Sequence, residues 1–229
     1  MRLLVTRPLE DAGTLERRLV ALGHQVITSP LLTIAPRADI VIPAEPYQAI
    51  ALTSANAIRC LQDSGHLDGL RHLPVLAVGP QSAAAARQAG FANITEAGGD
   101  GIGLARYMIG ALDPQAAPVL YLSGLDTASD FTGLLENGGL STRRVIVYEA
   151  RPAVTLAPEA AGAEGVLLYS PRSARIWLDL AKHQAIPADV MVHYCLSANI
   201  AAILPDAFAT RVAARPVEEA LLEIIGPAR

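Results

Sequence analysis

Residues 51–58 read ALTSANAI, and residues 167–174 read LLYSPRSA. In both stretches a short apolar run ends at a small hydroxylated residue, Ser54 or Ser170, and a helix-like stretch follows. This order is typical of the corner at which a strand passes into a helix in an α/β fold. Because the same corner occurs twice, 116 residues apart (170 − 54), the chain is expected to repeat one structural pattern.

Strand-like runs alternate with helical stretches along the rest of the chain. LLV at 3–5 precedes a helical stretch that ends near Gly23, and the runs 48–52, 75–79 and 119–124 stand before further helical or Ser/Gly-rich segments. Alternation of this kind indicates βαβ units, in which parallel strands are connected by helices. The fold class predicted is therefore α/β with parallel sheets.

The repeat extends over the whole chain, since twice 116 is 232 and the chain has 229 residues. At the same offset, further pairs carry the same residue type: Leu4 and Leu120, Gly23 and Gly139, Pro36 and Pro152. Two similar α/β lobes are therefore predicted.

The segments SPLLTIAP (29–36) and VIVYEARP (145–152) occupy equivalent places in the two copies. Each is a candidate crossing from one lobe to the other, and together they predict a two-stranded linker. The boundaries expected on this reading are 1–35 plus 152–229 for lobe one, 39–146 for lobe two, and about 29–38 and 145–152 for the linker strands. On the repeat alone, a tandem division into 1–115 and 116–229 remains open.

Composition narrows the class of protein. Apolar residues make up 52% of the chain and charged residues 17%, which indicates a packed globular protein, and a net charge of −4 argues against nucleic acid or an anionic membrane as partner. Cys60 and Cys195 lie in apolar contexts and are expected to be buried thiols in a reducing compartment. No histidines or cysteines stand at metal-ligand spacing, and no signal peptide or membrane span is evident, so we expect no metal and a cytoplasmic location.

Candidate binding residues are those beyond the carboxyl ends of the predicted strands, where open parallel sheets bind ligands. Most are small or hydroxylated, and several begin helices, whose free N–H groups favour anions. The alternative is that the serines and threonines are ordinary N-caps. The set is Arg7, Thr53, Ser54, Gly79, Gly98 to Gly103 with Gly101, Ser123, Gly124, Ser170 and Ser197. The stretch GGDGIG (98–103) departs from both G-x-G-x-x-G and the Walker pattern, which favours a flexible loop or helix start over a phosphate cradle.

Tyr148 is the polar residue of greatest interest. It lies in a predicted linker strand, and its phenol can donate a proton or a hydrogen bond. The alternative is an aromatic ring that packs in a half-buried strand. No Ser-His-Asp pattern or carboxylate pair accompanies it, so the chemistry is expected to need few side chains.

The chain resembles uroporphyrinogen-III synthase over nearly its full length. The resemblance is carried by LLVTRP (3–8), ALGHQVITSPLLTI (21–34), YQAIALTSANAI (47–58), LAVGPQSAAAARQAGF (76–91), VLYLSG (119–124), RRVIVYEARP (143–152) and GVLLYSPRSA (165–174). It implies two α/β lobes joined by a two-stranded linker, with lobe one made from both chain ends and the active site in the inter-lobe cleft. It thus favours the swapped boundaries over the tandem ones.

The resemblance also implies a cofactor-free lyase of porphyrin, tetrapyrrole and heme biosynthesis, acting as a cytoplasmic monomer. Its substrate would be hydroxymethylbilane, which loses hydroxide from ring A to give an azafulvene. Ring D would then attack through its substituted carbon, and a spiro intermediate would reopen and close to uroporphyrinogen III with ring D inverted. A non-catalytic two-lobe module that binds an anionic small molecule is the alternative, and a nucleotide-dependent α/β enzyme is a third hypothesis.

Residue roles follow from the same resemblance. Tyr148 matches the family's linker tyrosine and is expected to help the hydroxyl depart. The expected cleft-lining residues are Arg7, Ser54, Ser82 and Ser170, with Ser197 and Asn199 carried over at a corner where Leu196 replaces a common glycine and Asn199 a common threonine. Asn56 and Arg172 differ between the two repeated corners and are expected to contribute specificity.

Overall fold

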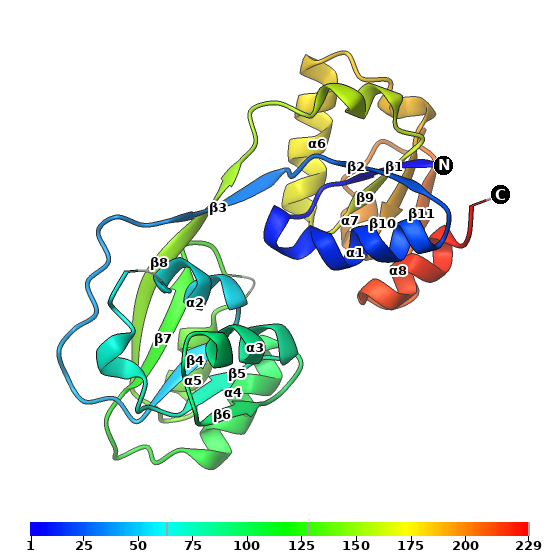
Figure 1. The fold of residues 1–229 in the computed structure, drawn as a ribbon. Helices are drawn as coiled ribbons and strands as arrows, with labels where there is room; N and C mark the ends of the chain where they lie inside the picture. Colours follow the sequence, from blue (N-terminus) through cyan, green and yellow to red (C-terminus); the bar gives the residue numbers. More distant parts are fainter. Residues whose placement is uncertain (63, 128, 229) are drawn as a thin grey trace. The chain divides into compact units, whose positions relative to one another are not determined.

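The computed structural model describes residues 1–62, 64–127 and 129–228. It divides the chain into two compact units, each with its own sheet and core (Figure 1). Unit 1 comprises Met1–Thr33 and Arg151–Arg229, and unit 2 comprises Ile34–Ala150. Unit 1 is thus built from both ends of the chain.

Unit 1 contains a five-stranded sheet in the order β11-β10-β9-β1-β2, and every pairing in it is parallel. Its strands are β1 (Arg2–Val5), β2 (Gln25–Thr28), β9 (Gly165–Leu168), β10 (Val192–Cys195) and β11 (Thr210–Val212). Its helices are α1 (Leu9–Ala21), α6 (Pro171–His183), α7 (Ala198–Ala201) and α8 (Glu218–Ile225), with short 3-10 turns at Pro158–Gly162 and Ala188–Val190.

Helices cover both faces of this sheet, because successive residues of its strands point to opposite sides. On β1, Leu4 packs in the cluster that contains Trp177 of α6, whereas Leu3 packs in the cluster that contains Leu19 of α1 and Leu221 of α8. The central strand β9 is therefore buried at every position and carries no polar side chain, as is typical of parallel strands covered on two faces.

Unit 2 contains a six-stranded sheet in the order β3-β8-β7-β4-β5-β6. Its strands are β3 (Leu32–Pro36), β4 (Ala49–Leu52), β5 (Val75–Ala77), β6 (Ile94–Glu96), β7 (Val119–Gly124) and β8 (Thr142–Pro152). Its helices are α2 (Ala55–Leu61), α3 (Pro80–Gln88), α4 (Gly101–Ala111) and α5 (Phe131–Asn137), with a 3-10 turn at Asp68–Leu70. Side chains of α2 and α3 fill the core on one face, and those of α4 and α5 fill it on the other.

β3 and β8 form the two-stranded connection between the units. The Arg37 N–H donates to the Val147 carbonyl at 3.1 Å, and the Ala153 N–H donates to the Leu31 carbonyl at 3.0 Å. As one strand advances the other runs back, so the pair is antiparallel, whereas β8 pairs with β7 in parallel.

The two units share one strand order when the 116-residue repeat is applied. The repeat matches β1 with β7 and β9 with β4, and the remaining strands then align so that β11-β10-β9-β1-β2 corresponds to β6-β5-β4-β7-β8. The matched glycines Gly23 and Gly139 have φ of 83° and 88°, and the matched corner residues Ser54 and Ser170 have φ of −153° and −152°. The prediction of two similar parallel-sheet α/β units is confirmed.

Two further observations concern the sequence expectations. Cys195 is buried as expected, while Cys60 is only half-buried, and no disulfide joins them. In the described part of the chain, no helix is both long and apolar enough to span a bilayer.

His193 is fully buried in unit 1 and stacks on Phe208, with 5.0 Å between the ring centroids. The Trp177 indole N–H donates to His193 Nε2 at 3.0 Å, so this nitrogen must be unprotonated. Burial lowers the pKa of His193 from its ordinary value of 6.5. Protonation therefore costs the folded state more than the unfolded chain.

We expect unit 1 to lose stability as the pH falls below about 6.5, because there the unfolded chain binds a proton that folded His193 does not. The contribution of one such group is at most about 1.4 kcal/mol per pH unit. The unfolding temperature is measured between pH 7.5 and 5. As the pH is lowered, it should fall less steeply for His193→Gln than for the wild type; the Gln amide oxygen can still accept a hydrogen bond from Trp177. The exposed His66 supplies the control, His66→Gln, which should keep the wild-type slope; equal slopes for wild type and His193→Gln would contradict the prediction.

Candidate active site

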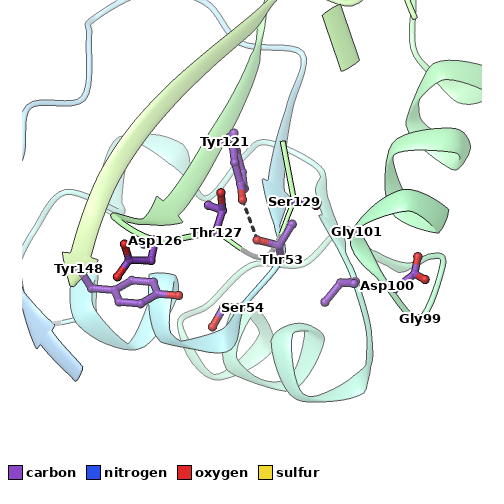
Figure 2. A pocket seen from close by; sticks show the side chains of 12 residues that line it. Thr53, Ser54, Gly99, Asp100, Gly101, Tyr121, Asp126, Thr127, Ser129 and Tyr148 are labelled. Carbon is purple, nitrogen blue, oxygen red and sulfur yellow. Dashed lines mark hydrogen bonds between the residues drawn. The ribbon is translucent and has the colours of Figure 1, made fainter. Parts of the chain in front are cut away.

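A pocket of about 430 Å³ opens at the carboxyl ends of the central strands of unit 2. Thr53 follows β4, Val78 follows β5 and Gly124 ends β7, so the ends of three neighbouring parallel strands meet at the pocket. The pocket is lined by Thr53, Ser54, Val78, Gly99, Asp100, Gly101, Tyr121, Gly124, Asp126, Thr127, Ser129 and Tyr148 (Figure 2).

The first corner of the pocket is the start of α2. Ser54 is the N-cap of this helix, and its hydroxyl oxygen accepts from the Asn56 N–H at 3.2 Å. The neighbouring Thr53 hydroxyl is hydrogen-bonded to the Tyr121 hydroxyl at 2.9 Å. The corner read from ALTSANAI is therefore both a helix cap and part of the pocket wall.

The glycine-rich stretch at 98–103 is a tightly folded helix start. The Asp100 carboxylate caps α4 by accepting from the Gly103 N–H at 2.7 Å. Gly98 has a φ of 99°, and a Cβ placed on it would lie 2.2 Å from the Leu104 nitrogen, while one on Gly103 would lie 2.4 Å from the Gly98 oxygen. Both positions must be glycine because the backbone at Gly98 packs directly against the backbone at the start of α4. Of the two structures predicted for 98–103, a flexible loop or a helix start, this supports the helix start.

Tyr148 reaches the pocket from a bulge in β8. Ser123 is paired with Ile146, but Gly124 is paired with Tyr148, so Val147 is an extra residue on β8. A bulge of this kind bends a strand and changes the direction of the side chain that follows. In Figure 2 the Tyr148 ring extends across the pocket, with its hydroxyl directed toward the side where Ser54 lies.

Gly124 provides the space for this ring. A Cβ at position 124 would lie 2.7 Å from Tyr148 Cζ and 2.9 Å from the Tyr148 hydroxyl oxygen. The backbone adds a further link, because the Leu125 N–H donates to the Tyr148 carbonyl at 2.9 Å. Gly124 and Tyr148, both predicted as site residues, are therefore brought into direct contact.

Arg144 ties the end of β7 to β8. Its Nε donates to Ser123 Oγ at 2.9 Å, and its Nη2 donates to the Gly124 and Leu125 carbonyls at 2.8 and 2.9 Å. The Ser123 hydroxyl in turn donates to the Gly124 carbonyl at 3.0 Å. Ser123, predicted to bind substrate, is thus buried and occupied with the local backbone, and it does not line the pocket.

The match that defines the family spans most of the chain: the family model described as Uroporphyrinogen-III synthase HemD covers residues 13–223. The chain belongs to the uroporphyrinogen-III synthase family. Enzymes of this family act in heme biosynthesis.

Solved structures agree on the fold. Uroporphyrinogen-III synthetase from Helicobacter pylori matches with a TM-score of 0.71 at 17% sequence identity, over 98% of both chains. A mutant uroporphyrinogen III synthase from the extremely thermophilic bacterium Thermus thermophilus matches with a TM-score of 0.52 at 13% identity, over 96% of this chain and 94% of that one. No sequence match to a curated protein was found.

The site residues predicted in unit 1 lie at the corresponding edge of its own sheet, since Arg7, Ser170 and Ser197 follow β1, β9 and β10. Arg7 Nη1 forms an ion pair with Glu218 at 2.6 Å, and its guanidinium lies 4.8 Å from the centroid of the Tyr169 ring. Burial raises the pKa of Tyr169 strongly. Arg7 is therefore held by its own unit.

The other predicted residues of unit 1 belong to helix starts. Ser170 caps α6 and forms a capping box with Ser173, whose N–H it accepts at 3.0 Å, and Arg172 follows in the first turn. Ser197 is the N-cap of α7 without a side-chain cap bond, and Asn199 is exposed. Their role in binding stays a prediction.

Two predicted residues of unit 2 lie on helices away from the pocket lining. Asn56 is buried in α2, and its side-chain oxygen accepts from Arg59 Nη1 at 3.0 Å. Ser82 is buried in the first turn of α3. The structure therefore gathers Thr53, Ser54, Gly101, Gly124 and Tyr148 in one pocket, whereas Asn56, Ser82 and Ser123 do not line it.

Several lining residues were not predicted from the sequence, notably Tyr121, Asp126, Thr127 and Ser129. Tyr121 lies in the middle of an apolar strand sequence, where an aromatic residue is expected to pack in the core. The other three follow β7 in a segment without periodicity, although their position after a predicted strand end was a usable signal. Among the described residues, no group of three or more histidine, cysteine or acidic side chains could hold a metal ion.

We expect Gly124→Ala to destabilise the protein by about 1–3 kcal/mol, because the new methyl group would overlap the Tyr148 ring. Urea unfolding measures the change in the free energy of unfolding. Gly110→Ala is the matched control, since a Cβ there meets nothing within 4 Å and lies in α4, where alanine is favoured by roughly 0.5–1 kcal/mol. A Gly124→Ala variant as stable as wild type would refute the proposed overlap.

Proposed function

We propose that this protein is a uroporphyrinogen-III synthase, a lyase that cyclises hydroxymethylbilane to uroporphyrinogen III with loss of water and inversion of ring D. The observation that carries the proposal is the family match over residues 13–223. The pocket supports it, because a tyrosine lies among hydroxyl groups at the carboxyl ends of parallel strands, where this class of sheet binds ligands.

Tyr148 is proposed to assist the departure of the ring A hydroxyl. Its phenol donates a hydrogen bond, and then a proton, to the leaving oxygen, so the group departs as water while the pyrrole nitrogen supplies the electrons that form a protonated azafulvene. Loss of the N–H proton of this cation, which restores the phenol, gives the neutral azafulvene. The bulge in β8 and the contact with Gly124 restrict where the phenol can lie. A donor held in one place assists the reaction without reorganisation at the moment of bond breaking.

The later steps require control of conformation more than additional acids or bases. Ring D attacks through its substituted carbon, the spiro intermediate reopens, and closure at the other carbon inverts the ring. Since the azafulvene can also close directly to the wrong isomer, the protein contributes mainly by holding the folded bilane in the productive arrangement. Arg7, Ser170, Arg172, Ser197 and Asn199 of unit 1 are proposed to bind the same substrate.

No cofactor is included in this proposal, and a cytoplasmic monomer is the assembly and location we expect. Each of these three stays a prediction. Light scattering coupled to size exclusion addresses the monomer directly.

The reaction itself is tested by supplying hydroxymethylbilane and separating the porphyrin isomers after oxidation. We expect the type III isomer to predominate over the type I isomer that forms without enzyme. If only type I appears, at the rate measured without protein, the proposed activity is wrong and the non-catalytic binding module becomes the reading to pursue.

Replacement of Tyr148 by phenylalanine removes the proposed donor and keeps the ring over Gly124. We expect kcat to fall about 100-fold, within the range for loss of a general acid, with little change in the unfolding temperature. Tyr47→Phe is the matched control: the Tyr47 hydroxyl donates to the Pro43 carbonyl at 2.9 Å in the same unit, but Tyr47 does not line the pocket. Unchanged turnover by Tyr148→Phe would show that this residue only packs.

A further inference from the structure

Thr53 and Tyr121 form a pair of hydroxyl groups in the pocket wall. Their oxygens are 2.9 Å apart, and both residues line the pocket (Figure 2). The Tyr121 side chain is 1% exposed and its ring packs on Phe131, with 4.7 Å between the centroids. The phenol is therefore fixed by the core of unit 2 and presents only its hydroxyl to Thr53.

A count of hydrogens shows that this pair has one donor to spare. Two hydroxyl groups carry two hydrogens, and the single bond between them uses one. Within the described part of the chain, neither hydroxyl has another hydrogen-bond partner. Whichever group donates, one O–H remains available at the pocket.

The spare hydrogen is assigned by the acidity of the two groups. A phenol is the stronger donor, and burial raises the pKa of Tyr121, so its hydroxyl stays protonated at neutral pH. Tyr121 then donates to Thr53 Oγ1, which leaves the Thr53 hydrogen free. Thr53 is also the more exposed member of the pair, so its hydrogen is the one a ligand can reach.

We propose that Tyr121 is a positioning residue that orients the Thr53 hydroxyl as a hydrogen-bond donor to an oxygen atom of the bound tetrapyrrole. A hydroxyl that accepts one hydrogen bond becomes a better donor in the next, so the pair is stronger than Thr53 alone. This inference rests on the function proposed above and assigns a role to a residue outside that mechanism.

Two kinds of oxygen on the substrate could accept this bond. An acid side chain of the bilane is present before and during reaction, so loss of its donor raises KM and leaves kcat unchanged. The ring A hydroxyl gains negative charge only as it departs, so loss of that donor lowers kcat. The kinetic split between KM and kcat therefore identifies the acceptor.

The experiment compares Tyr121→Phe, Thr53→Val, Thr53→Ser and the double variant Thr53→Val/Tyr121→Phe. We expect kcat/KM to fall about tenfold in Thr53→Val and about threefold in Tyr121→Phe, as for loss or weakening of one hydrogen bond. The double variant should be no worse than Thr53→Val, because Tyr121 acts only through Thr53. Thr53→Ser keeps the hydroxyl and should retain most of the activity.

Unchanged kcat and KM in Tyr121→Phe, or losses that multiply in the double variant, would overturn the proposal. Two controls show whether removal of a buried phenol oxygen lowers activity only by destabilising the protein. The first is the unfolding temperature of every variant, and the second is the kinetics of Tyr47→Phe. If Tyr47→Phe loses as much activity as Tyr121→Phe, the role assigned to Tyr121 is wrong.

Binding of uroporphyrin III, the oxidised and stable form of the product, is measured by calorimetry in the same variants. If the wild type makes no type III isomer but binds uroporphyrin III, weaker binding by Thr53→Val supports the pair and only the proposed activity fails. Uroporphyrin III carries the acid side chains but no hydroxyl, so equal binding by wild type and Thr53→Val excludes an acid side chain as the acceptor. Because in that case the protein also releases no hydroxyl, no acceptor remains and the pair is refuted. If the wild type neither turns over hydroxymethylbilane nor binds uroporphyrin III, the role of the pair is refuted with the activity.

Discussion

The parallel pairing of β7 with β4 on one side and β8 on the other is the constraint on which the pocket depends. Every residue of β4 and β7 is buried, so these strands are held in register by burial on both faces. A shift of one residue would exchange the two faces of β7 and turn Tyr121 away from Thr53. The pocket is thus a consequence of the sheet, since its walls follow the ends of strands whose register the core fixes.

The bulge opposite Gly124 allows two neighbouring residues of β8, Val147 and Tyr148, to meet different requirements. Val147 is fully buried in the same cluster as Leu122, whereas Tyr148 must extend over the end of β7. With the extra residue, β8 can bury Val147 and also extend Tyr148 over the end of β7. The bulge interrupts the backbone hydrogen bonds between β7 and β8 beside the Gly124 and Leu125 carbonyls. Arg144 supplies donors to both of these acceptors, so the irregular strand end keeps its backbone polar groups satisfied.

The architecture could be predicted from local patterns. Apolar runs, corners such as ALTSANAI and a repeat at 116 residues were sufficient for two parallel α/β units, because each signal lies within a few residues or recurs at one offset. The roles of Tyr121 and Arg144 could not be predicted in this way. The adjacent Arg143 and Arg144 look alike in sequence, yet Arg143 pairs with Glu45 while Arg144 binds backbone carbonyls of β7. Such partners are set by strand pairing, which no single stretch of sequence encodes.

The electrostatics of the pocket bear on which oxygen Thr53 meets. The sequence suggested that helix starts would receive the acid groups of a ligand, but Ser54 and Asp100 already cap α2 and α4, and each cap uses one of the free N–H groups there. The carboxylates of Asp100 and Asp126 also line the pocket, and like charges at close range repel. A neutral hydroxyl avoids this repulsion, and Tyr148 lines the same pocket. The capped helix starts and the Asp100 carboxylate therefore make this wall of the pocket less suited to an acid side chain of a ligand than the helix starts alone would suggest.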